Sequence, residues 1–221
     1  MVKALFADFC GTIVYEDDPA INIITERIYS TGKSNDKSEI GRYWWNDFQS
    51  LFLNSYGDNF CLQRELEHKS LVNTIKNFCS SEDAGELSNI MFDYWAKPPI
   101  FEESKEFFER CPVPIYLVSN IDNCDIQSAI NLHLLKPAGV FTSENARSYK
   151  PRKEIFELAL KTTGLKPEEV VYIGDSVTSD VNGAKAAGIS AIWLNRFGKV
   201  NLHNLFEVRD LLKFLETEFF S

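Results

Sequence analysis

The chain has 221 residues, of which 44% are hydrophobic, and its formal net charge is −9. This length suffices for one large domain or for a core with a smaller second domain, and the acidic balance argues against general binding of nucleic acid or anionic membranes. No apolar run approaches the ~20 residues of a membrane span, and the N-terminus lacks the pattern of a signal peptide. The five cysteines form no CxxC pair and no disulfide framework, so we expect a reduced, cytoplasmic protein.

The first part of the chain predicts one strand followed by a long helical segment. Residues 3–7 form a short apolar run, and residues 20–96 then indicate helices, separated by turn-forming clusters, with no convincing strand. Asp36 and Glu39 have the spacing of a capping box at the start of one of these helices. The pattern is typical of about four helices packed as a bundle.

The helix that follows Asp36 is rich in aromatic side chains, which we expect mainly in the core of the bundle. Trp44 and Trp45 cannot both face inward, because neighbouring residues of a helix point about 100° apart. One of them is therefore expected to line a cleft or to lie on a contact surface. Arg42 and Arg64 are expected in solvent, although either could meet a substrate anion.

After residue 98 short β-rich runs alternate with helices. The expected strands are residues 115–118, 139–141, 170–173 and 191–194, and the expected helices are residues 101–110, 124–132, 153–163 and 179–187. Gly164 and Gly188 are placed to end the last two helices. Near-continuous apolar strands that alternate with helices predict a parallel sheet covered on both faces.

The sequence thus predicts an α/β fold: a Rossmann-like parallel core of residues 1–16 and 98–221, interrupted by a helical cap of residues 17–97. The two connections, near residues 17–19 and 97–99, are natural hinges.

Residues able to do chemistry follow several of these strands. Asp8 ends the first apolar run, and Ser119, Lys150, Asp175 and Asp180 each come shortly after a later one. Each has an ordinary structural explanation by itself, as a turn residue, a helix cap or a solvated lysine. Because ligands bind at the carboxyl edge of a parallel sheet, their joint placement favours a functional site over a coincidence.

The charges of this group indicate a particular chemistry. Three carboxylates at one edge would raise each other's pKa unless a cation intervened, and Mg²⁺ prefers such oxygen ligands. Lys150 adds a fixed positive charge, while Ser119 and the backbone N–H groups of residues 9–12 can donate to phosphate oxygens. The set fits nucleophilic phosphoryl transfer through an aspartyl-phosphate on Asp8.

Four motifs carry a resemblance to a known family. They read DFCGT from Asp8 to Thr12, LVSN from Leu117 to Asn120, YKP from Tyr149 to Pro151, and GDSVTSD from Gly174 to Asp180. In this order they resemble the haloacid dehalogenase-like hydrolase superfamily, in the branch with a helical cap inserted after the first core strand.

The resemblance implies a nucleophile at Asp8 and a Mg²⁺ ion held by Asp8, the backbone carbonyl of Cys10 and Asp175, with support from Asp180. It also implies that Lys150 orients Asp8. The residues expected to bind the substrate are Gly11, Thr12, Ser119, Asn120 and Lys150.

Position 10 departs from the pattern of phosphatases in this superfamily, which usually have a second aspartate there as the general acid and base. A cysteine thiol donates hydrogen bonds poorly, and loss of a positioned acid or base typically costs ~10²–10⁴ in rate. We favour Cys10 as a space-filling residue over a catalytic thiol. We therefore expect slow hydrolysis of alkyl phosphates and faster hydrolysis of aryl or acyl phosphates.

Two alternatives remain open at this stage. Relatives that cleave carbon–halogen bonds also lack an acid at this position, so a metal-independent dehalogenase acting on a halogenated acid is the second enzyme hypothesis. A weakly catalytic protein that binds a phosphorylated ligand is the third. The lysines of the cap region match no Schiff-base motif: Lys33, Lys37, Lys69 and Lys76. The sequence leaves the substrate and the oligomeric state open.

Overall fold

The structure is a computed structural model that describes residues 2–16 and 18–220. The chain divides into two compact units, which are described separately. The first comprises Met1–Glu16, Pro99–Asn120 and Ile130–Ser221, and the second comprises Asp17–Pro98 and Ile121–Ala129. Of the hinge expected at residues 17–19, Asp17 lies outside the described residues.

The first unit is built on a six-stranded parallel sheet with the order β3-β2-β1-β4-β5-β6. The strand at its centre, β1, lies between β2 and β4 and is entirely buried. The strands are β1 (Ala4–Ala7), β2 (Ile115–Ser119), β3 (Gly139–Thr142), β4 (Val170–Gly174), β5 (Ser190–Leu194) and β6 (Glu207–Val208). Because all strands run in the same direction, the residues that follow them gather at one edge.

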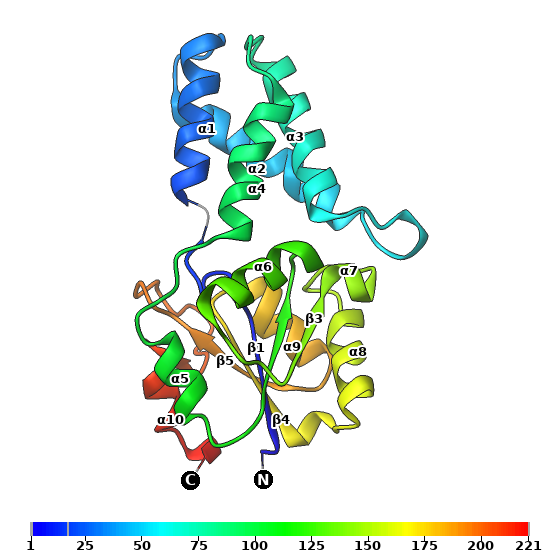
Figure 1. The fold of residues 1–221 in the computed structure, drawn as a ribbon, viewed down its shortest axis with the longest axis vertical. Helices are drawn as coiled ribbons and strands as arrows, with labels where there is room; N and C mark the ends of the chain where they lie inside the picture. The colour runs from blue at the N-terminus through cyan, green and yellow to red at the C-terminus, as the bar shows by residue number, and fades with distance from the viewer. Residues whose placement is uncertain (1, 17, 221) are drawn as a thin grey trace. The chain divides into compact units, whose positions relative to one another are not determined.

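Helices complete this unit (Figure 1). Their bounds are α5 (Ser104–Arg110), α6 (Asn123–His133), of which only residues 130–133 belong to this unit, α7 (Ser143–Ala146), α8 (Glu154–Thr163), α9 (Gly183–Ala186) and α10 (Leu211–Leu215). One face of the sheet packs on α8 and α9 through a cluster that includes Phe6, Phe156 and Tyr172. Residues that alternate with these along the strands, such as Leu5 and Val171, are also fully buried, so both faces are covered as predicted.

Two details of the core differ from the sequence-based expectation. The strand β6 was not predicted, because two residues are too few for a periodic signal. The helix expected at residues 179–187 is instead a π-helix, η3 (Val177–Asn182), followed by the short α9. Single π-turns of this kind occur frequently at functional sites. Gly164 ends α8 in the left-handed conformation, as predicted.

The second unit contains the expected four-helix segment: α1 (Asp18–Thr31), α2 (Lys37–Leu53), α3 (Gln63–Asn77) and α4 (Ala84–Ala96), with the short 3₁₀ turn η1 (Gly57–Asn59). Its core joins apolar residues of all four helices, among them Ile24, Trp44, Leu71 and Met91. Trp44 is buried and its indole donates to Ser70 at 3.1 Å, whereas Trp45 is 56% exposed. The adjacent tryptophans therefore face different ways, as the helical geometry requires.

The start of α2 shows half of the predicted capping box. Asp36 is the N-cap residue, and its carboxylate accepts from the backbone N–H of Ser38 at 2.9 Å. The carboxylate of Glu39 instead accepts from the hydroxyl of Ser34 at 3.0 Å, so it does not complete a box. The spacing of Asp36 and Glu39 could not predict this, because the competing hydroxyl belongs to Ser34, five residues before Glu39.

The second unit also includes Ile121–Ala129, which the sequence assigned to the core. Both carboxylate oxygens of Asp122 accept backbone N–H groups at the start of α3, from Gln63 at 2.9 Å and Arg64 at 3.0 Å. The guanidinium of Arg64 forms a two-pronged ion pair with the buried Asp125. Arg64 is thus already paired with the carboxylate of Asp125.

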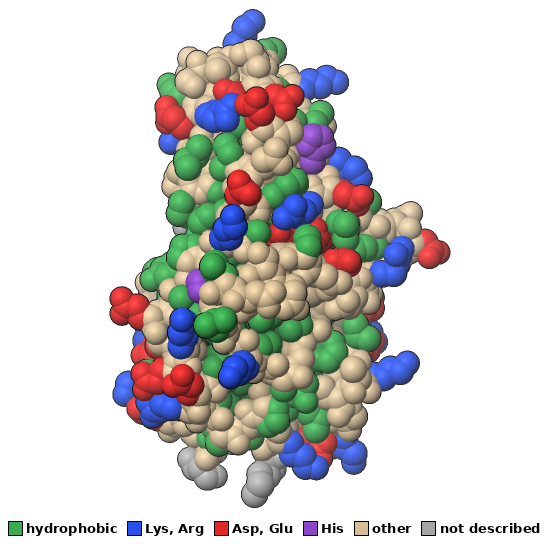
Figure 2. Space-filling view, in the orientation of Figure 1, with side chains coloured by type: hydrophobic (Ala, Val, Ile, Leu, Met, Phe, Trp, Pro, Cys, Tyr) green, Lys and Arg blue, Asp and Glu red, His purple; other side chains and the backbone are tan. Residues whose placement is uncertain are grey.

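Most other ion pairs of the helical unit are at its surface, such as Lys37 with Glu26 and Arg27 with Glu86. Figure 2 shows acidic and basic side chains beside one another on the drawn face. Among the described residues, no helix has the length and apolar character required to cross a membrane.

Candidate active site

The site begins at Asp8, the residue directly after β1. Its backbone N–H still bonds to the carbonyl of Ile173 at 2.9 Å, so the sheet fixes the position of its backbone. The chain then turns sharply, because the carbonyl of Phe9 accepts the N–H groups of Ile13 at 2.8 Å and Val14 at 3.0 Å. The carboxylate of Asp8 therefore stands at the carboxyl edge of the central strand, where the Asp8 side chain is 9% exposed.

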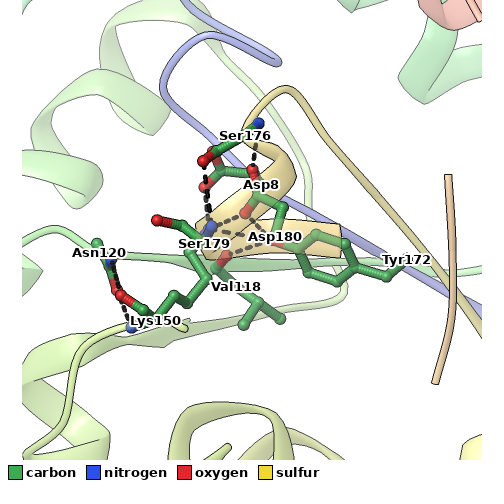
Figure 3. A network of polar contacts seen from close by, with 8 residues as sticks. All are labelled: Asp8, Val118, Asn120, Lys150, Tyr172, Ser176, Ser179 and Asp180. Carbon is green, nitrogen blue, oxygen red and sulfur yellow. Dashed lines mark hydrogen bonds and ion pairs between the residues drawn. The ribbon is translucent and has the colours of Figure 1, made fainter. Parts of the chain in front are cut away.

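Lys150 meets Asp8 inside the core unit (Figure 3). Its Nζ donates to Oδ1 of Asp8 at 2.7 Å and to Oδ1 of Asp180 at 2.5 Å, and the lysine side chain is 2% exposed. A third contact joins Nζ to the hydroxyl of Tyr172 at 3.0 Å. One buried ammonium group thus links two carboxylates from different strand ends.

The residues at the end of β2 hold the backbone around Lys150. The side-chain amide of Asn120 donates to the carbonyl of Lys150 at 3.0 Å and accepts its backbone N–H at 2.6 Å. Both functional groups of Asn120 therefore help to position Lys150, and its expected contact with the substrate stays a prediction. Ser119, the last residue of β2, is buried and pairs in register with Thr142 of β3.

The loop after β4 supplies the other two carboxylates. The backbone carbonyl of Asp175 accepts from the indole of Trp193 at 2.8 Å, and Oδ2 of Asp180 accepts from the backbone N–H of Ser176 at 2.9 Å. Asp180 lies in the π-helix and folds back toward β4, where a Cβ atom on Gly174 would lie 2.4 Å from its Cγ. A side chain at Gly174 would thus displace Asp180.

The loop after β1 contains a second required glycine. Gly11 has a φ of +75°, and a Cβ atom there would lie 2.6 Å from Cγ of Asp175. Its backbone N–H donates to the carbonyl of Val14 at 2.8 Å, so that amide is already bonded within the loop. Cys10 is half-buried, and Thr12 is buried with its carbonyl accepting from Arg196 at 2.6 Å.

Asp8, Asp175 and Asp180 each place a carboxylate oxygen within 4.8 Å of the others. Burial and the charge of Asp180 raise the pKa of Asp8 to about 6, against the opposing effect of Lys150. Burial and the charges of Asp180 and Asp8 also raise the pKa of Asp175 well above its ordinary value. Both shifts arise first from burial and then from the neighbouring carboxylates, and Lys150 opposes them only in part.

The shift of Asp8 has a consequence for stability without a bound cation. The folded chain holds the Asp8 proton more tightly than the unfolded chain, whose ordinary pKa is 3.8. The corresponding stabilisation is present below that value and is lost as pH rises through about 6. The site is therefore electrostatically unfavourable at neutral pH and would gain from a bound cation.

Lys150 shows the complementary behaviour. Burial alone would lower the pKa of its ammonium group, but the charges of Asp180 and Asp8 and their hydrogen bonds raise it above its ordinary value. The ammonium group is thus permanently charged near neutral pH and serves as a fixed cation.

Two further residues of this region were not singled out from the sequence. Tyr172 lies in an apolar run that predicts a buried strand. Its hydroxyl could have indicated a role in the site, because a buried tyrosine requires a hydrogen-bond partner. Arg196 follows β5, forms an ion pair with Glu103, and stacks on the ring of Phe101 at 3.8 Å. Neither partner of Arg196 is near it in sequence, so no local pattern could have indicated the contact.

Comparisons with known proteins concern the family and the fold. A family model described as haloacid dehalogenase-like hydrolase matches residues 2–188. Phosphoserine phosphatase of Thermus thermophilus is 28% identical over 120 residues, which cover 52% of this chain and 48% of the relative. Glyceraldehyde 3-phosphate phosphatase of Pyrococcus furiosus is 44% identical over 50 residues, covering 23% and 20%. The chain spans less than half the length of these curated relatives.

Solved structures share the fold over nearly the whole chain. L-2-haloacid dehalogenase from Xanthobacter autotrophicus superposes with a TM-score of 0.77 at 19% identity, covering 98% of each chain. A HAD phosphatase from Thermococcus onnurineus superposes with a TM-score of 0.65 at 21% identity, covering 98% of this chain and 97% of that one. At these identities the likeness concerns architecture alone, which is common to a dehalogenase and a phosphatase.

Proposed function

Because this chain belongs to the haloacid dehalogenase-like hydrolase family, we propose that it is a Mg²⁺-dependent phosphatase that acts on a small phosphorylated metabolite. The observation that carries the proposal is the buried carboxylate of Asp8, held by Lys150 within a group of three carboxylates. The phosphoserine and glyceraldehyde 3-phosphate phosphatases among the relatives support a small phosphate ester as the substrate class.

The donor set fits a magnesium ion. Carboxylate oxygens are the ligands that Mg²⁺ prefers, and the three aspartates carry three formal negative charges against the one positive charge of Lys150. Burial and the neighbouring carboxylates raise the pKa values of Asp8 and Asp175, which supports a bound cation at this site. Asp8, Asp175 and the carbonyl of Cys10 would hold the ion, with Asp180 in support. When bound, the ion would offset the charge of the phosphate group.

The residues of the chain account for the bond changes. A carboxylate oxygen of Asp8 attacks phosphorus, the bond from phosphorus to the ester oxygen breaks, and the leaving oxygen takes up a proton from water. Water then hydrolyses the acyl phosphate, which restores the Asp8 carboxylate and releases inorganic phosphate. Lys150 keeps Asp8 ionised and aimed, because its ammonium group contacts Oδ1 at 2.7 Å.

Cys10 stands where a phosphatase of this family usually has its general acid. We propose that Cys10 fills space, so the leaving oxygen must depart with little assistance from that position. Aryl and acyl phosphates, whose leaving groups need less protonation, are then better substrates than alkyl phosphates.

We assign to the helical insertion, residues 17–97, the role of a cap that excludes water and selects the substrate. The basis is its separate core, which is independent of the sheet. Its committed Arg64 is a poor candidate for binding a substrate anion, because Asp125 already accepts two of its N–H groups.

A dehalogenase is the second candidate function, and the cysteine at position 10 is the observation that favours it. The acidic group at Asp175 weighs against it, because carbon–halogen cleavage through Asp8 requires no divalent ion.

The test measures phosphate release from alkyl, aryl and acyl phosphates, and halide release from 2-haloacids, with Mg²⁺ or with EDTA. The Asp8→Asn variant is compared with Asp210→Asn, at a helix N-cap where asparagine serves equally well. We expect Mg²⁺-dependent phosphate release that Asp8→Asn abolishes and Asp210→Asn retains. Halide release that survives EDTA would establish the dehalogenase, and ligand binding without turnover would establish the binding protein.

A further inference from the structure

The hydroxyl of Tyr172 reaches into the polar network from a buried strand (Figure 3). Its side chain is fully buried, and its ring packs edge-on against Phe156 with 5.3 Å between the ring centroids. The hydroxyl oxygen lies 3.0 Å from Nζ of Lys150, 2.8 Å from Oδ1 of Asp180 and 3.2 Å from the carbonyl oxygen of Val118. The packed ring of Tyr172 therefore holds its hydroxyl oxygen in place against Lys150 and Asp180.

The hydroxyl oxygen of Tyr172 is important because of the number of hydrogen bonds that Lys150 can donate. An ammonium group has three N–H donors and no acceptor. The structure supplies three acceptors for them, Oδ1 of Asp8, Oδ1 of Asp180 and the hydroxyl of Tyr172. Without the third acceptor, one buried N–H would lack a partner and the flexible lysine side chain could turn away from Asp8.

The single hydroxyl proton of Tyr172 has two acceptors within reach. The carboxylate of Asp180 is closer than the carbonyl of Val118, and a charged acceptor forms the stronger bond. The hydroxyl oxygen thus accepts a hydrogen bond from Lys150, and the hydroxyl proton is donated to Asp180. If Asp180 turns to another donor, the carbonyl of Val118 keeps the hydroxyl bonded.

We propose that Tyr172 is a positioning residue for the reaction, because its hydroxyl fixes the direction in which Lys150 presents its other N–H groups to Asp8 and Asp180. The catalytic consequence rests on the proposed phosphatase function, whereas the structural consequence does not. In this structure the three N–H groups of Lys150 serve Asp8, Asp180 and Tyr172, so loss of the hydroxyl is expected to act on kcat and not on KM.

The test compares Tyr172→Phe with Tyr116→Phe, the same chemical change in β2, which lies on the other side of β1. Tyr116 packs against the same core cluster but has no contact with Lys150. With an aryl phosphate and Mg²⁺, Y172F is expected to lower kcat about tenfold and to leave KM within about twofold, as expected for one lost bond to a charged group. Y116F is expected to change neither value beyond about twofold.

Crystal structures of both variants provide a readout that needs no activity. In Y172F, Nζ of Lys150 is expected to leave hydrogen-bond distance of Asp8 or to occupy two positions, whereas in Y116F it stays in place. A kcat within twofold of the unmodified chain, or an unmoved Nζ in Y172F, would overturn the proposal. If the unmodified chain hydrolyses no phosphate ester, the phosphatase proposal fails, and the position of Nζ still decides the role of Tyr172.

Should Y172F not fold, 3-fluorotyrosine placed at position 172 keeps the ring and weakens the hydroxyl as an acceptor. A smaller fall in kcat with unchanged KM then supports the proposal, and an unchanged kcat overturns it.

Discussion

The two units of this chain both bury charged groups, but they use them differently. In the helical unit, Asp125 is matched by one arginine and Asp122 by two backbone N–H groups at the start of a helix. In the core unit, three carboxylates gather around the single ammonium group of Lys150. Matched charges stabilise a fold, whereas an excess of one sign creates a site that favours a cation or a charged reactant. Buried charged groups alone therefore do not indicate a functional site, whereas an excess of buried charge of one sign does.

Removal of the one cation from the crowded group should have the largest effect. Lys150→Met leaves Asp8 and Asp180 buried without their partner, so we expect the free energy of unfolding to fall by about 3–5 kcal/mol at pH 7 without Mg²⁺. Urea unfolding measures this change. Lys153→Met is the control, because Lys153 is 57% exposed and pairs only with Glu157, and its effect should stay below about 0.5 kcal/mol. Equal effects of the two variants would contradict the account.

Loss of the ion pair between Arg64 and Asp125 in the helical unit should have the second largest effect on stability. Arg64→Met leaves the carboxylate of Asp125, whose side chain is 1% exposed, without its cation, and we expect a loss of about 3 kcal/mol in the same urea experiment. Arg42→Met removes an arginine that is 70% exposed and should cost less than about 0.5 kcal/mol. If Arg64→Met were as mild as Arg42→Met, the ion pair would not stabilise this unit.

A methyl group at the glycine beside Asp175 should have an intermediate effect. Gly11→Ala combines a positive φ with a collision against a carboxylate, so we expect at least about 2 kcal/mol of destabilisation. Gly164→Ala shares the positive φ but meets open space, and it should cost about 1 kcal/mol. Thermal unfolding of both variants separates the collision from the backbone strain, and a difference near zero would remove Asp175 from its place beside Gly11.

The smallest expected effect is an increase in turnover. Cys10→Asp places a carboxyl group where related phosphatases have their acid, and we expect turnover of an alkyl phosphate to rise about tenfold, with a smaller rise for an aryl phosphate. Steady-state kinetics with both esters measures the contrast. Cys79→Asp, at an exposed position whose φ of 49° aspartate tolerates, is the control. Unchanged turnover in Cys10→Asp would mean that position 10 has no part in the proton transfer.

The sequence predicted the core fold because apolar strands alternate with helices, and parallel strands bring their carboxyl ends to one edge. That rule alone is enough to expect Asp8, Lys150 and Asp180 near one another. It could not show that Asn120 bonds the backbone of Lys150, because the two residues are joined only through tertiary structure. It also could not show the π-turn at Asp180, since the same residues suit an α-helix, and it treated Tyr172 as an ordinary strand residue.

Asp8 is the proposed nucleophile, and the most direct measurement is to trap its covalent intermediate. The unmodified chain is mixed with an acyl or aryl phosphate and Mg²⁺, quenched in acid within one turnover, digested and analysed by mass spectrometry. The account predicts one added phosphoryl group on the peptide that contains Asp8, and none in Asp8→Asn. A phosphoryl group on another residue, or rapid turnover with no labelled peptide at any quench time, would contradict it.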